Sequence, residues 1–180
     1  SIQKAVIEMA LTIPVESFSA GPANNPQTAE NNPSPWDFLN GVTPGCALTD
    51  PTYGCLPQGM SARVLAEEAG WIPDIHEETV EIGSAREIRL TKINGVAKAV
   101  DRYVKVPINV AETLYYTIEV RKQEGYDQNL AGGGVIIHDM NTTRSGGAAP
   151  MQVVDDDGDL DQTDAGAIWT VGETFTDAVN

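Results

Sequence analysis

Apolar and polar residues alternate along short segments of the second half of the chain. Gly83-Ser84, Asn94-Gly95 and Asn109 separate several of these segments, which are rich in β-branched and aromatic residues. Alternation of this kind is typical of half-buried β-strands, and short strands in series predict an antiparallel β-sandwich. The expected strands lie within residues 78–82, 86–93, 97–108, 113–122, 132–140, 148–154 and 167–171.

The first part of the chain has a different pattern. Residues 2–13 are apolar on nearly every side and are followed by Pro14, which predicts a mostly buried helix. Residues 60–69 have helical periodicity, with Ser61 as a cap and Gly70 at the end. Residues 17–57, rich in Pro, Asn, Gly, Ser and Thr, predict a long irregular segment. We therefore expect a mainly β protein with two short helices, divided into residues 1–72 and a β-sandwich domain of residues 73–180.

Charge narrows the choice of partners. The 180 residues include 11 basic and 26 acidic ones, for a formal net charge of −15, which repels nucleic acids and anionic lipid surfaces. No run of about 18 apolar residues occurs, so we expect no membrane span. Acidity with many Asp, Asn, Thr and Gly residues suits a secreted protein that binds Ca²⁺ through oxygen ligands. Because the chain begins with Ser1, we expect it to be a piece of a longer protein.

Two short motifs also point to an extracellular location. Cys46 and Cys55 bracket a short loop containing Pro51 and Gly54, and they would either close a small disulfide ring or remain two free thiols. Asn141-Thr142-Thr143 matches the acceptor pattern for N-glycosylation at an expected strand end.

Residues 154–164, VDDDGDLDQTD, form an acidic loop with Gly158 at a turn. Aspartate oxygens at such spacings wrap a hard cation, and crowded carboxylates repel each other without one. The alternative is a solvated acidic turn that serves solubility. A bound Ca²⁺ would join the strand that ends at Val154 to the segment that carries Trp169. The expected ligands are Asp155, Asp157, Asp161 and Asp164, with Asp159 as an alternative.

The first helix carries one glutamate, Glu8, in a setting that parallels a zinc-protease helix. Such a helix needs two histidines four residues apart around the general-base glutamate, and a third ligand beyond a turn. The corresponding positions hold Ile7, Leu11 and Ser17, none of which is a competent zinc ligand. The alternative interpretation is an ordinary buried helix that happens to carry one glutamate.

Further motifs follow Glu8 in a fixed order. They are SAGP (19–22), PWDFLNG (35–41), SARVLAEEAGWI (61–72), YYTIEVR (115–121), GGGVIIH (132–138) and WTVGE (169–173). In order and spacing, the chain resembles the immune inhibitor A and gametolysin-like secreted zinc metallopeptidases. The resemblance implies a remnant of a metzincin-like catalytic lobe before the β-domain. It also implies that the zinc ligands are degenerate and that Leu39 replaces the methionine of the turn. The two histidines of the chain, His76 and His138, lie outside this segment.

Three functions remain open from the sequence. The first is a non-catalytic C-terminal region of a secreted metallopeptidase-like protein, in which a calcium-stabilised β-sandwich supports a missing upstream catalytic lobe or mediates attachment. The second is a structural or adhesive extracellular subunit that assembles with itself or with other subunits. The third is an active zinc endopeptidase, with Glu8 as general base, if the sequence is truncated or misassigned at the ligand positions.

Overall fold

The structure is a computed structural model that describes residues 48–51, 54–56, 59–93, 102–128, 130–144, 150–155, 157, 159 and 164–177. The first helix lies outside this part of the chain, so the expectations for Ile7, Glu8, Leu11 and Ser17 stay predictions. Cys46 lies outside it too, and only the backbone of Cys55 is described. The disulfide and the division at residue 72 therefore also stay predictions.

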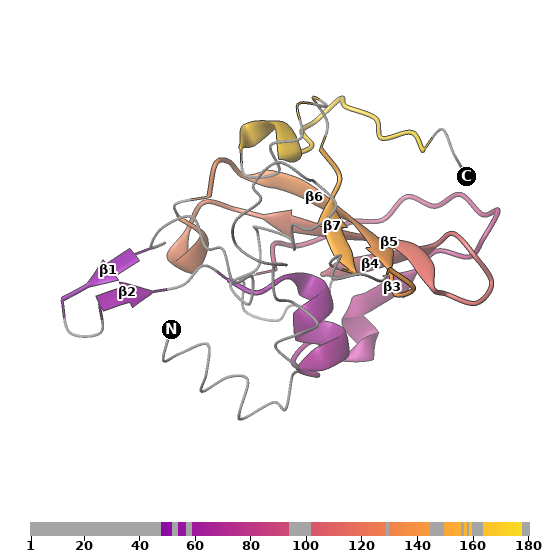
Figure 1. Cartoon of the computed structure of the whole chain (residues 1–180), viewed down its shortest axis with the longest axis horizontal. Coiled ribbons are helices and arrows are strands. Elements are labelled where there is room, and N and C mark those ends of the chain that lie inside the picture. Colours follow the sequence, from indigo (N-terminus) through magenta and orange to yellow (C-terminus); the bar gives the residue numbers. More distant parts are fainter. Residues whose placement is uncertain are drawn as a thin grey trace.

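Five strands form one sheet in the order β3-β4-β5-β6-β7 (Figure 1). Neighbouring strands are antiparallel except β3 and β4, which are parallel. The strands are β3 (Glu77–Thr79), β4 (Tyr103–Pro107), β5 (Leu114–Arg121), β6 (Gly134–Asn141) and β7 (Met151–Val153). The expected mainly β class is confirmed. Within the described residues the other sheet is a two-stranded hairpin, so a two-sheet sandwich is not confirmed.

Two of the expected strands form other structures. Residues 86–93 make a single isolated bridge, Lys92 to Val120, while Ile88 and Leu90 line a cavity beside the sheet instead of pairing with it. Within residues 167–171 only Trp169 bridges to the sheet, opposite Val135, after the 3-10 helix η6 (Ala165–Ala167). Apolar alternation marks the side of a segment that contacts the core, and it does not require that the backbone join a sheet.

The helix expected at residues 60–69 is present, but most of it is a π-helix, η3 (Val64–Glu68). The Val64 amide donates to Ser61 Oγ at 3.4 Å, and Gly70 has a φ of 64°. Both are the helix ends that the sequence predicts. Two 3-10 turns, η4 (Asp74–His76) and η5 (Gly125–Asp127), complete the helical elements of the described residues.

The segment that was expected to be irregular up to residue 57 contains a hairpin. Strands β1 (Leu48–Asp50) and β2 (Gly54–Leu56) pair antiparallel, with Thr49 opposite Cys55. Pro51 follows the first strand directly, where a fixed φ suits a turn. The expectation of an irregular segment up to residue 57 was therefore wrong over these six strand residues.

The central strand β5 buries its polar face. Thr117, Glu119 and Arg121 are each at most 2% exposed, whereas Ile118 and Val120 on the opposite face are only half-buried. Helix η3 and the chain just before it lie on the buried face, as the contacts below show. A strand whose charged side chains point inward needs partners for each of them.

Arg121 is the centre of that polar interior. Its Nε donates to Glu119 at 2.6 Å, and its Nη1 donates to Asp127 at 2.8 Å. The same two carboxylates accept the backbone amides of Ala62 and Gly59. Burial raises the pKa of Asp127, although Arg121 opposes this shift. Charged side chains thus attach residues 59–62 to the sheet.

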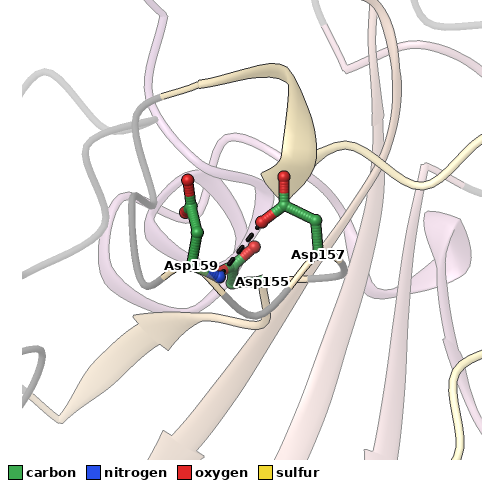
Figure 2. A group of neighbouring side chains, drawn as sticks. All are labelled: Asp155, Asp157 and Asp159. Carbon is green, nitrogen blue, oxygen red and sulfur yellow. Dashed lines mark hydrogen bonds between the residues drawn. The ribbon is translucent and has the colours of Figure 1, made fainter.

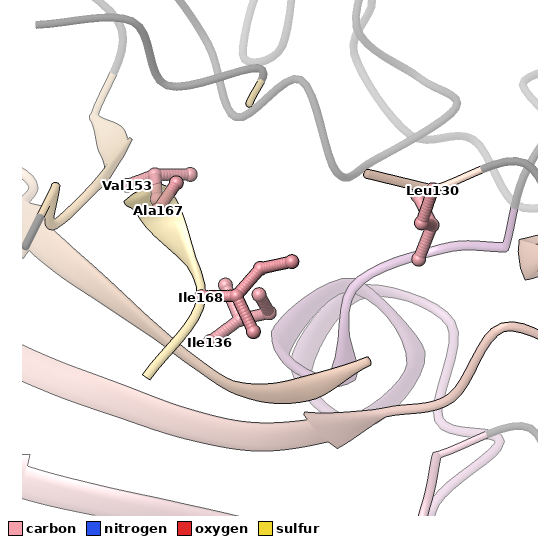
Figure 3. Close-up of a cluster of buried hydrophobic side chains, with 5 residues drawn as sticks. All are labelled: Leu130, Ile136, Val153, Ala167 and Ile168. Carbon is pink, nitrogen blue, oxygen red and sulfur yellow. The ribbon is translucent and has the colours of Figure 1, made fainter. Parts of the chain in front are cut away.

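Three apolar clusters complete the core of the described residues. The first joins the η3 region to β4 through Ala62, Ile72, Ile93 and Tyr103, and the second packs Tyr115 against Met140 and Met151. The third, drawn in Figure 3, consists of Leu130, Ile136, Val153, Ala167 and Ile168. No helix in the described residues is long and apolar enough to cross a bilayer.

Candidate metal centre

Three carboxylates gather at the end of β7. Asp155, Asp157 and Asp159 each offer an oxygen, and these oxygens all lie within 4.8 Å of one another (Figure 2). Asp155 is half-buried, and the other two side chains are exposed. The Asp159 amide donates to Asp157 Oδ1 at 3.1 Å, which folds the loop back on itself. Three like charges this close repel each other unless a cation lies among them.

Both ends of the loop are fixed to the sheet. Val154, just before it, donates its amide to Ile137 O at 2.8 Å and accepts a hydrogen bond from Trp169 Nε1 at 3.3 Å. After the loop, Trp169 exchanges backbone hydrogen bonds with Val135. Phe175 then packs edge-on against Trp169, with ring centroids 5.5 Å apart. The three carboxylates all follow β7, so a cation bound by them would hold the start of the loop, and the segment that carries Trp169 contributes none of these ligands.

Only some of the expected ligands come together in the structure. Asp155 and Asp157 come together with Asp159, the residue that the sequence offered as an alternative. Asp164 lies outside this group: it precedes η6, and its Oδ1 accepts the Gly166 amide at 2.7 Å. Asp161 is outside the described residues.

Gly166 is a neighbour of the site that the sequence analysis did not single out. A methyl group at this position would overlap the carboxylate of Asp157. The close approach of η6 to Asp157 is visible in Figure 2. Glycine therefore permits the carboxylate to lie against η6, and its place two residues after Asp164 is the signal that could have drawn attention to it.

We expect Gly166→Ala to weaken Ca²⁺ binding by about tenfold or more, because the displaced Asp157 could no longer share a cation with its neighbours. Calcium titration followed by calorimetry measures the change. Gly133→Ala is the matched control, since its added methyl group would make only ordinary contacts near Arg121 and Lys122. Equal affinities for the two variants would show that calcium binding does not depend on the contact of Asp157 with Gly166.

The donor set suits a hard cation. Carboxylate oxygens are the ligands that Ca²⁺ prefers, while Zn²⁺ sites favour histidine and cysteine. Neither histidine of the chain belongs to the group: His138 is fully buried on β6 and His76 is buried at the end of η4. The site therefore fits calcium and does not fit catalytic zinc.

The expected glycosylation acceptor, Asn141, is the last residue of β6. Its Oδ1 accepts hydrogen bonds from the Thr143 amide at 2.9 Å and the Thr143 hydroxyl at 2.7 Å. The side chain is half-buried and lies in a turn, at the strand end that the sequence predicts. Modification at this position stays a prediction.

Searches against protein-family models, curated proteins and solved structures give no match to this chain, so the resemblance to secreted metallopeptidases stays a prediction.

Proposed function

We propose that this chain is a non-catalytic, calcium-stabilised β-domain of a secreted protein, which acts as a scaffold or an attachment domain. The observation that carries the proposal is the group of three aspartates at the end of β7, whose oxygens lie within 4.8 Å of one another. A cation bound there would hold the acidic loop closed against the sheet.

The position of the group supports a structural role. The cluster of Figure 3 contains Val153, which precedes the loop in the chain, and Ala167, which follows it. A ligand that fixes this loop would therefore stabilise the packing of η6 on the sheet. A catalytic metal, in contrast, needs an open coordination position beside groups that act on a substrate.

The non-catalytic part of the proposal rests on the sequence. Ile7, Leu11 and Ser17 stand where the resembled metallopeptidases hold zinc, and none of them supplies an imidazole nitrogen. The domain would then support an upstream catalytic lobe, or another subunit, without hydrolysing peptides itself.

Elemental analysis tests both parts in one experiment. The full chain is equilibrated with Ca²⁺ and Zn²⁺ together, freed of unbound metal, and analysed. We expect roughly one calcium and no stoichiometric zinc per chain. D157N/D159N is expected to lose the calcium. E81Q/E87Q also removes two negative charges, from exposed positions between β3 and β4, and is expected to retain the calcium.

Two outcomes would overturn separate parts of the proposal. Calcium retained by D157N/D159N, or absent from the unaltered chain, would refute the metal centre. One zinc per chain, with chelator-sensitive cleavage of casein, would establish the zinc endopeptidase instead.

A further inference from the structure

A cavity of about 440 Å³ lies on the face of the sheet opposite to η3. The strands contribute five aliphatic side chains to its wall: Val104, Val106, Ile118, Val120 and Val135. Ligand sites in proteins commonly have volumes of roughly 300–1,000 Å³ and mostly apolar walls. The size and lining of this cavity therefore match those of a site for a small apolar molecule.

The other wall is the segment of residues 81–92, which we call the strap. It begins after β3 with a turn at Gly83, whose φ is 78°, and it passes Ile88 and Leu90 across the cavity. Hydrogen bonds fix it at both ends. The Val80 amide donates to Lys105 O at 2.9 Å, and the Ile93 amide donates to Val120 O at 3.0 Å. The strap thus forms the outer wall of a cavity that stays open to solvent.

The cavity lies beside the aliphatic face of β5, since this strand buries its charged face instead. Because Glu119 and Arg121 occupy the fully buried face, the aliphatic Ile118 and Val120 are left only half-buried beside the cavity. An aliphatic occupant would cover these side chains and gain the favourable transfer of its own methylene groups from water. That gain corresponds to about fourfold in affinity for each buried methylene.

One charged residue, Arg86, belongs to the wall. Its side chain is about half exposed and forms an ion pair with Glu78 of β3. A guanidinium carries five N–H donors, so the pair leaves donors for a second carboxylate. Because Arg86 is the charged residue of an otherwise aliphatic wall, it would favour an anionic head group over a cationic one.

We propose that this cavity binds a short aliphatic carboxylate, with the hydrocarbon chain between the strap and the sheet and the carboxylate at Arg86. The assignment is independent of the metal centre. It uses the other face of the sheet and none of the three aspartates.

Titration of the full chain with hexanoate, octanoate and decanoate, in buffer that contains calcium, tests the proposal. Methyl NMR is expected to show shifts at Ile118 and Leu90 and none at Val171, which is fully exposed. Affinity should rise about fourfold per methylene until the cavity is full. Octanol has no carboxylate to pair with Arg86, so its affinity should be about threefold to tenfold lower than that of octanoate.

Two pairs of variants separate the cavity from the rest of the surface. R86Q should lower octanoate affinity by about threefold to tenfold and leave octanol affinity unchanged, whereas R89Q, on the exposed side of the strap, should alter neither. I118F should abolish binding of both ligands, and V110F, at a 92% exposed position, should retain it.

Absence of any methyl shift with octanoate in the folded chain would overturn the proposal. Unchanged octanoate affinity in R86Q would overturn the role of the carboxylate, and this result stays decisive even if I118F fails to fold.

Discussion

Replacing Arg121 with leucine is expected to lower the free energy of unfolding by about 3–5 kcal/mol. The side chain of Arg121 is fully buried between Glu119 and Asp127, whose side chains are 2% and 0% exposed. Leucine fills part of the volume but leaves two carboxylates in a site that water does not reach. Removal of one member of a buried charged group is costly because the remaining charges lose their compensation. Urea denaturation, followed by far-UV circular dichroism, measures the loss.

The control for this variant is the next residue along the chain. Lys122 is 66% exposed and pairs with Glu124 at 3.0 Å, so K122L should change stability by no more than about 0.5 kcal/mol. Adding E119Q and D127N to R121L should recover part of the loss, since amide oxygens still accept the Ala62 and Gly59 amides. If this triple variant were no more stable than R121L, lost packing rather than unpaired charge would explain the effect.

Calcium at about one hundred times its dissociation constant is expected to raise the free energy of unfolding by about 2.7 kcal/mol relative to excess chelator. For a chain of this length, that corresponds to an increase of roughly 5–10 °C in Tm. The physical reason is that the folded loop holds oxygens of Asp155, Asp157 and Asp159 within 4.8 Å of one another, whereas the unfolded chain does not fix them there. Thermal unfolding in the two buffers measures the difference.

Simple screening must be separated from this effect. With a net charge of −15, added salt of any kind weakens the repulsion within the folded chain. The chelator buffer therefore contains NaCl at equal ionic strength. D157N/D159N should lose the difference between the two buffers, and E81Q/E87Q should keep it. A melt of the unaltered chain that is indifferent to calcium would contradict the proposed role of the loop.

The sequence located the strands of the sheet better than it located their faces. Tyr115 to Arg121 alternates cleanly, with one tyrosine on each side, but it places Glu119 and Arg121 on one side and Ile118 and Val120 on the other. The general rule that aliphatic residues point to the core does not hold for β5, because partners from Gly59, Ala62 and Asp127 satisfy the charges on the inner side. Gly59 is 62 residues from Arg121, and Ala62 is 57 residues from Glu119, so no local pattern reveals these two partners.

The metal centre was predictable in part for the opposite reason. Asp155, Asp157 and Asp159 are close in the chain, and alternate positions in a tight loop place their carboxylates near one another. Asp164 was harder to place because aspartate has two common uses, as a metal ligand and as a helix cap, and here it accepts the Gly166 amide. Spacing alone does not choose between these uses.

The polar interior of β5 also fixes the alignment of the strand with its neighbours. A slip of one residue would turn Glu119 and Arg121 toward the strap and separate Arg121 from Asp127. In most sheets such a slip is unfavourable because it exposes the apolar face of the strand to water. This penalty is small when both faces carry hydrophobic side chains. Here the penalty is electrostatic, so misaligned states of this sheet should be rare even though Ile118 and Val120 would pack well on either side.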